Sequence, residues 1–257
     1  MCVILFAHRV DPRYSLAVAA NRDEFHDRAA APLGFWHDAP GVLGGRDLTG
    51  GGTWIGVTRS GRLAAITNYR EPSVPLRPDA PSRGRLTRDF LTGREGAREY
   101  LDSIAGSASE YSGFCLLVFD GDNLAFFSNR GGAPKTLPPG VYGLSNHLLD
   151  TPWPKVLRGR ERLASALSDG SDPVPAMFEI LRDRTFAADA ELPRTGLPLE
   201  AERELSPLFV VGDRYGTRSS TVILLGEREI EASERTFSPD ATLAASRAYR
   251  IDRIPAA

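Results

Sequence analysis

The sequence predicts an α+β protein in which antiparallel sheets are covered by helices. The β-rich segments come in blocks joined by short turns, and these blocks surround two helical blocks. Strands and helices do not alternate one by one, as they would in a series of βαβ units. No internal repeat, low-complexity tract or domain boundary interrupts the chain, so we expect one domain over residues 1–257.

The first seventy residues are expected to form two hairpins. The continuous apolar run Cys2–His8 is followed by a second apolar run at residues 16–21, close enough to pair with it. Residues 54–58 and 63–67 flank a short turn that contains glycine, which predicts the second hairpin. Between the hairpins, residues 44–53 are rich in glycine. Such a segment forms a tight loop, or cradles phosphate where it opens a helix; here a strand pattern follows, which favours the loop.

The middle and end of the chain predict helices and further strands. Residues 71–81 carry four prolines and are expected to form a loop, and Ser82 is a candidate N-cap for the helix after it. Residues 186–204 lack a clear period and are expected to be a mobile loop, and the tail after Pro239 is weakly patterned. The expected helices cover residues 82–91, 94–104, 155–167 and 175–181. The expected later strands cover residues 114–119, 124–128, 141–145, 209–211, 219–225 and 229–236, and the first two of these are expected to form a third hairpin around the turn at residues 120–123.

Charge and apolar content exclude several classes of protein. The 31 basic and 33 acidic residues give a net charge of −2, which argues against binding to nucleic acid or to an anionic membrane surface. The apolar stretch at residues 2–7 is too short for a signal peptide, and no run approaches the roughly 20 apolar residues of a membrane span. Two cysteines in 257 residues make no disulfide framework. We therefore expect a soluble protein of the cytoplasm, with no integral membrane segment.

Cys2 is the most informative residue. Removal of Met1 would leave it with a thiol and an α-amine on the same residue, and the amine, with an ordinary pKa of about 7.7–8.0, could accept the thiol proton. The alternative is that position 2 only needs a small residue at the start of a strand. Cys115 lies in an apolar run and is expected to be a buried small hydrophobe.

Four polar groups occur where expected strands begin or end, which is where functional sites are usually built. Each group alone is also typical of a turn. Together with Cys2 they supply a nucleophile, oxyanion donors and a cation. The groups are Asn21-Arg22-Asp23-Glu24, Asn68-Tyr69-Arg70, Asn146-His147 and Thr217-Arg218-Ser219-Ser220.

These blocks, in this order, resemble the NRDE family, also called the Transport and Golgi Organisation 2 family. The resemblance extends from residue 2 to about residue 222 and also includes Gly51-Gly52-Thr53-Trp54, Ser82-Arg83-Gly84 and Thr151-Pro152-Trp153-Pro154-Lys155. It implies an αββα four-layer sandwich of the N-terminal-nucleophile hydrolase type. The choloylglycine hydrolase and penicillin V acylase group are the distant relatives with known chemistry.

The resemblance also implies roles for single residues. Cys2 matches the nucleophile, and Asp23 matches the aspartate that holds the N-terminal amine. Asn68 matches the oxyanion donor, Asn146 the second asparagine of the site, and Arg218, more loosely, a late arginine. The other polar residues of these blocks are expected to bind the substrate: Asn21, Arg22, Glu24, Tyr69, Arg70 and His147.

One departure from the acylases concerns Arg22. The acylases carry an arginine three residues before the aspartate, whereas Arg22 directly precedes Asp23. Because neighbours on a strand point to opposite faces, only one of the two can face the cysteine unless the strand ends or bulges there.

Two functions of different classes follow from the resemblance. The first is a cysteine amidohydrolase that acts on a linear non-peptide amide, or on an acyl thioester. The second is a non-catalytic carrier or chaperone for haem, acyl-coenzyme A or lipid that uses the same pocket. For acyl-coenzyme A, the candidate phosphate-binding residues are Arg70, Arg83 and Arg85, although arginine is so common in this chain that their presence alone proves nothing. No cofactor is expected to be required and no metal-ligand cluster is visible; haem is a candidate ligand although no histidine lies in an attachment motif. The expected partner is therefore a small acyl or haem ligand.

Overall fold

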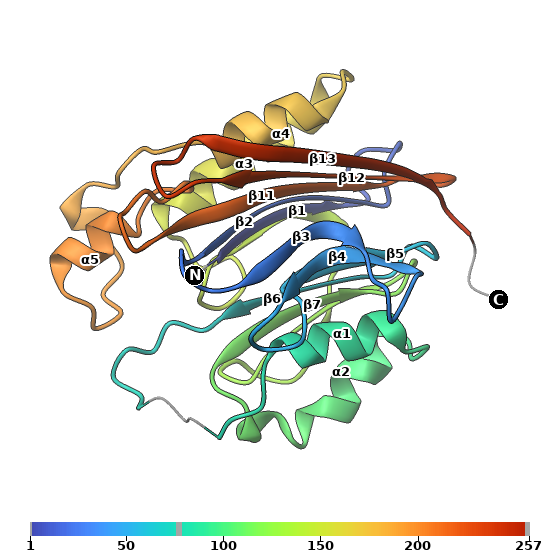
Figure 1. Cartoon of the computed structure of the whole chain (residues 1–257), viewed down its shortest axis with the longest axis horizontal. Helices are drawn as coiled ribbons and strands as arrows, with labels where there is room; N and C mark the ends of the chain where they lie inside the picture. The colour runs from blue at the N-terminus through green and yellow to red at the C-terminus, as the bar shows by residue number, and fades with distance from the viewer. Residues whose placement is uncertain (1, 76–78, 255–257) are drawn as a thin grey trace.

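The computed structural model describes residues 2–75 and 79–254. Two antiparallel sheets lie face to face, and each is covered on its outer side by helices (Figure 1). The order of layers is therefore helix, sheet, sheet, helix, which confirms the αββα prediction.

The first sheet has the strand order β10-β1-β2-β11-β12-β13, with antiparallel neighbours throughout the described residues. It contains the predicted first hairpin, in which Cys2 lies directly opposite Arg22. Its strands are β1 (Cys2–His8), β2 (Leu16–Phe25), β10 (Gly140–Leu144), β11 (Tyr215–Leu225), β12 (Glu229–Phe237) and β13 (Leu243–Asp252).

The second sheet has its strands in chain order, and its described neighbours are also antiparallel. The two other predicted hairpins, β5–β6 and β7–β8, lie within it. Its strands are β3 (Ala30–Phe35), β4 (Val42–Asp47), β5 (Ile55–Thr58), β6 (Leu63–Asn68), β7 (Phe114–Phe119), β8 (Leu124–Ser128) and β9 (Lys135–Thr136).

Helices α3 (Pro154–Ser168) and α4 (Pro173–Leu181) pack on the first sheet, and α1 (Gly84–Thr92) and α2 (Ala97–Ala105) pack on the second. The core follows these layers. One apolar cluster fills the space between the sheets, a second lies under α1 and α2, and a third lies under α3 and α4. On β1, Ile4 belongs to the cluster between the sheets, whereas Val3 faces the helices.

Several boundaries differ from the sequence-based expectations. The run at residues 209–211 is not a strand, although Phe209 and Val210 are buried. Residues 186–204, expected as a loop, contain a 3-10 turn at Asp189–Glu191 and the short helix α5 (Leu199–Glu204). Ser82 does not cap α1, whose N-cap position is Arg83. Part of the expected loop at residues 71–81 lies outside the described residues.

Candidate active site

The antiparallel topology brings the predicted polar groups to one edge of the first sheet. The start of β1 lies beside the end of β2 and the end of β10, and the start of β11 lies beside the end of β2. Cys2, Asp23 and Asn146 therefore meet although they are distant in sequence. The end of β6, which carries Asn68, approaches from the second sheet.

Cys2 is held through its backbone. Its nitrogen donates a hydrogen bond to Asn146 Oδ1 at 3.1 Å, and its carbonyl oxygen accepts one from Ser145 Oγ at 3.3 Å. Its side chain alternates with that of Val3 and so lies on the same face as Ile4, toward the second sheet. Burial raises the pKa of the thiol above its ordinary value, and the cationic Arg22 opposite opposes that shift. The thiol therefore needs a base to become a nucleophile.

Asn146 connects three strands. Its backbone has φ of 55°, a left-handed conformation that asparagine tolerates better than most residues. Its Nδ2 donates to the Asn68 carbonyl oxygen at 3.0 Å, and its own carbonyl accepts a hydrogen bond from the Arg70 nitrogen at 2.7 Å. Both the oxygen and the nitrogen of the Asn146 side-chain amide therefore form hydrogen bonds. Through the oxygen, the side chain fixes the position of the Cys2 backbone nitrogen.

Asp23 is fully buried behind Cys2. Thr217 Oγ1 donates to its Oδ1 at 2.7 Å, and the Tyr215 hydroxyl donates to its backbone carbonyl at 2.8 Å. Burial raises the pKa of the carboxyl group. The pairing of β2 with β11 shifts register between Thr217 and Ser219, which leaves Arg218 in a bulge next to Asp23.

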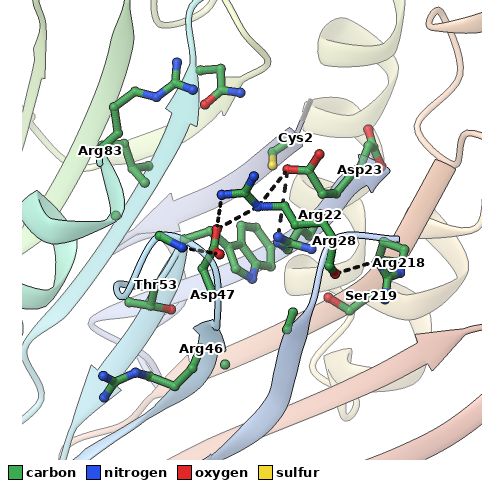
Figure 2. Close-up of a pocket in the computed structure, with 18 of the residues that line it drawn as sticks. Cys2, Arg22, Asp23, Arg28, Arg46, Asp47, Thr53, Arg83, Arg218 and Ser219 are labelled. Carbon is green, nitrogen blue, oxygen red and sulfur yellow. Dashed lines mark hydrogen bonds and ion pairs between the residues drawn. The ribbon is translucent and has the colours of Figure 1, made fainter. Parts of the chain in front are cut away.

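A cavity of about 850 Å³ opens between the sheets at this edge (Figure 2). Cys2, Arg22 and Asp23 all line it, so the adjacent arginine and aspartate both reach the cysteine region even though β2 continues to Phe25. Asn68 and Arg218 also line the cavity. Asn68 is exposed, unlike the preceding residues of β6, which are all buried.

The cavity is rich in arginine. Arg28 contacts Asp47 at 2.8 Å and Glu24 at 3.8 Å, and Arg22 also lies 3.8 Å from Glu24. Two other arginines have only backbone carbonyl partners among the described residues. Arg83 donates to the Gly113 carbonyl at 2.9 Å. Arg218 donates to the carbonyls of Phe25 and Arg28, at 2.8 and 3.2 Å.

In the view of Figure 2, Arg83 and Arg218 lie on opposite sides of Cys2. The position of Arg83 depends on a close backbone approach. A Cβ atom at Gly52 would collide with the carbonyl group of Gly84, so only glycine fits there and the start of α1 can lie against the cavity. Residues 44–47 of the glycine-rich segment belong to β4, and only residues 48–53 form a tight loop, in which Asp47 Oδ1 accepts hydrogen bonds from the nitrogens of Thr49 and Gly50.

Four of the expected substrate-binding residues do not line the cavity. The Asn21 amide is buried, and it donates to the carbonyls of Leu181 and Leu208 and accepts from Ser220 Oγ. The Asn21 side chain therefore connects β2 to the segments at Leu181 and Leu208, on the face of the sheet that the helices cover. A substrate-binding role does not fit Asn21, because its side chain faces away from the second sheet.

Arg70, Tyr69 and His147 form a supporting layer instead. Arg70 makes a buried ion pair of 2.6 Å with Glu202. The Tyr69 hydroxyl lies 2.8 Å from His147 Nε2, and His147 Nδ1 lies 2.8 Å from Thr151 Oγ1. These contacts fix the segments that follow Asn68 and Asn146. The three residues therefore stabilise the site without lining the cavity.

Thr217 and Lys155 were not predicted as residues of the site, and Arg83 was expected only as one of three candidate phosphate-binding arginines. Thr217 binds Asp23 and belongs to a block in which only Arg218 was singled out. Arg83 lines the cavity, and Lys155 is a fully buried cation on the helical side of Asp23. One signal was available for Lys155: it is one of only two lysines among the 31 basic residues.

The fold and the sequence together show which family the chain belongs to. A cysteine at the start of the first strand, with an asparagine on its nitrogen and an aspartate behind it, lies in the αββα sandwich of N-terminal-nucleophile hydrolases. The model of the family described as Transport and Golgi organisation 2 matches residues 1–239, and the chain belongs to that family.

Individual relatives agree with this assignment. The Transport and Golgi organization protein 2 homolog of Bos taurus is 37% identical, over 92% of this chain and 93% of the relative. Transport and Golgi organization protein 2 of Drosophila melanogaster is 29% identical, over 93% of each.

A solved structure, the mutant C2A conjugated bile acid hydrolase from Clostridium perfringens, has the same fold. It has a TM-score of 0.51 and 10% identity, and the alignment covers 98% of this chain and 92% of the other.

In residues 2–75 and 79–254, no helix has the length and apolar character needed to cross a bilayer. The same residues contain no group of three or more His, Cys, Asp or Glu side chains placed to hold a metal ion.

Proposed function

We propose that the chain is an N-terminal-cysteine hydrolase that cleaves a linear amide or an acyl thioester after Met1 is removed. The observation that carries this proposal is the 3.1 Å hydrogen bond between the Cys2 nitrogen and Asn146 Oδ1 at the wall of the cavity. After Met1 is removed, that nitrogen is the α-amine. A specific acceptor on it would fix the orientation of the amine relative to the thiol of the same residue.

The reaction begins with transfer of the thiol proton to the neutral amine. The sulfur then attacks the substrate carbonyl carbon and forms a C–S bond, and the carbonyl π electrons move to oxygen. Collapse of this intermediate expels the amine or thiol leaving group, which takes the proton from the Cys2 ammonium. Water then attacks the acyl thioester, with the amine again as base, and releases a carboxylic acid and the free thiol.

Asn68 is the proposed oxyanion donor. Its side chain is exposed to the cavity that Cys2 lines, whereas the Asn146 amide is engaged at both ends. Loss of one oxyanion donor typically lowers kcat by about 10²–10³. Asn146 is therefore assigned to orient the amine, and Asn68 to stabilise the charge that develops on the substrate oxygen.

The cavity favours a substrate that carries an anionic group. Its volume of about 850 Å³ accommodates an acyl chain with a head group. Arg83 and Arg218 line it and, among the described residues, pair with carbonyl oxygens but with no carboxylate. A guanidinium with free donors recognises a carboxylate or phosphate by forked hydrogen bonds.

The same arginines support a second candidate, a carrier that binds an anionic ligand such as haem or acyl-coenzyme A without turnover. In a carrier, Cys2→Ser would leave binding almost unchanged, because an alcohol replaces the thiol at nearly the same volume. In an enzyme, Cys2→Ser would abolish turnover, because the alcohol is far harder to deprotonate than the thiol.

The test is one panel of ligands and variants. N-acyl amides, acyl thioesters and haem are each incubated with wild type, Cys2→Ser, Asn68→Ala and, as a matched control, Cys115→Ser. Turnover that is lost in Cys2→Ser, reduced about 10²–10³-fold in Asn68→Ala and retained in Cys115→Ser supports the hydrolase. Saturable binding without turnover in every protein would contradict the hydrolase and support the carrier.

A further inference from the structure

Lys155 is one of two lysines in a chain whose other basic residues are arginines. Of the 31 basic residues only Lys135 and Lys155 are lysines, and Lys135 is exposed on the short strand β9. Lys155, in the first turn of α3, is only 2% exposed. Arginine remains protonated when buried, whereas a buried lysine changes its pKa readily. Lys155 therefore places a buried ammonium group in the fold, and the groups around it indicate what its charge acts on.

The contacts of Lys155 place it on the helical side of β2. Its Nζ donates to the carbonyls of Leu205 and Pro207, at 2.7 and 3.4 Å. The next carbonyl in this segment, that of Leu208, accepts the side chain of Asn21. The segment at residues 205–208 therefore lies between α3 and β2, and it fixes the ammonium group against the strand that carries Asp23.

Asp23 lies on the same face of β2 as Asn21, two residues earlier. Further along the same segment, the Val210 nitrogen donates to Thr217 Oγ1, which in turn donates to Asp23 Oδ1. One short segment thus contacts Lys155, Asn21 and the hydrogen-bonding partner of Asp23. Asp23 and Lys155 are consequently brought together in the buried space behind Cys2.

The charged groups around Lys155 come from four elements. They are Cys2 on β1, Asp23 on β2, Arg70 after β6 and Glu202 on α5. Burial lowers the pKa of Lys155 to about 8, and Asp23 is the neighbour that most strongly opposes this shift. Lys155 in turn acts to lower the pKa of Asp23. Glu202 is already paired with Arg70 at 2.6 Å, so Asp23 is the carboxylate that Lys155 neutralises.

We propose that Lys155 is a positioning residue for catalysis: its ammonium neutralises Asp23 from behind, so that the α-amine of processed Cys2 remains uncharged and can act as the base. This inference rests on the proposed function. One carboxylate beside two amines favours one positive charge over two, because like charges repel in a buried space. Without Lys155, Asp23 would hold the Cys2 amine as an ammonium, which cannot accept the thiol proton.

The test measures the protonation of the amine directly. The chain has two cysteines, so cysteine labelled with ¹³C at Cα gives two NMR signals, and the Cys115→Ser variant assigns them. The Cys2 signal is followed against pH in wild type, Lys155→Met, Lys155→Gln, Lys155→Arg and the control Lys135→Met. Intact mass first establishes that each protein begins at Cys2.

We expect the wild-type amine to titrate below the ordinary range of about 7.7–8.0. In Lys155→Met and Lys155→Gln its midpoint should rise by about one to three pH units, because Asp23 then loses one of the cations beside it. Lys155→Arg and Lys135→Met should keep the wild-type midpoint. The wild-type value tests the proposal even if the neutral variants fail to fold.

The contradictory outcomes are distinguishable. A processed chain whose midpoint lies above 8 in wild type, or is unchanged in the two neutral variants, overturns the role of Lys155 and leaves the hydrolase proposal standing. A chain that retains Met1 has no Cys2 amine, and that result overturns both.

Discussion

The side-chain oxygen of Asn146 accepts a hydrogen bond from the backbone nitrogen of Cys2 at 3.1 Å, across 144 residues of sequence. The same amide donates a hydrogen bond to the Asn68 carbonyl. One side chain therefore connects the start of β1, the end of β6 and the segment that follows β10. A hydrogen-bond acceptor fixed on this nitrogen is what an N-terminal amine needs in order to act as a base in a defined direction.

Replacing Asn146 should therefore impair turnover more than ligand binding. Asn146→Gly retains the left-handed backbone at φ 55° and removes the amide, and we expect kcat to fall about 10²-fold because the amine loses its orientation. KM should change little. Asn146→Ala removes the same amide but strains the backbone, so it should also lower the melting temperature. Steady-state kinetics on both variants, with thermal melts, separate the two effects, and an unchanged kcat in Asn146→Gly would refute the assignment.

The two cysteines should differ in reactivity. Cys115 is fully buried, burial raises the pKa of its thiol to about 12, and its Sγ contacts the His147 carbonyl. Cys2 lines the cavity and has a base on the same residue once Met1 is removed. Brief treatment with iodoacetamide at pH 7, followed by peptide mapping, should show Cys2 alkylated at least about tenfold faster. Equal or reversed rates would show that Cys2 is not activated.

The buried ion pair between Arg70 and Glu202 should contribute to the unfolding free energy of the protein. Both side chains are buried, and Glu202 Oε1 also accepts from the nitrogen and hydroxyl of Thr195. Glu202→Gln removes the carboxylate of this pair while Arg70 keeps its charge, and breaking such a buried pair costs about 3–5 kcal/mol of unfolding free energy. The control is Glu200→Gln in the same helix, whose pair with Arg203 is exposed. Urea unfolding should show a large loss for Glu202→Gln only.

Acid should destabilise the protein through His147. Burial lowers the pKa of this histidine below its ordinary value of 6.5, and both ring nitrogens lie at 2.8 Å from hydroxyl groups. Below about pH 6.5 the unfolded chain takes up a proton that the folded chain does not, so stability is complete above this pH and falls as the pH decreases. Unfolding free energies at pH 7.5 and 5.5 should therefore differ less in His147→Gln than in wild type. The exposed His37→Gln variant should behave as wild type does; equal losses in all three proteins would exclude this role for His147.

Much of the fold could be predicted because local signals agree with the tertiary structure. The three predicted hairpins have continuous apolar strands and short turns, and all three are present. Strand β4 was missed because Gly44 and Gly45 disfavour strands, and only pairing with β3 and β5 makes it one. Strand β13 was missed because its residues are mostly exposed and show no apolar alternation. The run at residues 209–211 has strand composition, yet Val210 hydrogen-bonds through its backbone to Thr217, the partner of Asp23, and the run forms no strand.

The site could be predicted only in part. Cys2, Asp23, Asn68 and Asn146 were grouped as polar residues at strand ends, and the structure brings them together because antiparallel strands place those ends at one edge. Sequence proximity misassigned Asn21, since alternation turns it to the opposite face of β2 from Arg22. Lys155 comes from a helix on the other side of the sheet, and no local pattern relates it to Asp23.

The most direct test of the account is the mass of the protein before and after it meets an acyl thioester. Untagged protein is treated with a short-chain acyl thioester, quenched in acid within seconds and digested, and the N-terminal peptide is weighed. We predict a chain that begins at Cys2 and a fraction of that peptide heavier by one acyl group, absent in Cys2→Ser. A chain that retains Met1, or an acyl group found on Cys115 and not on Cys2, would contradict the account.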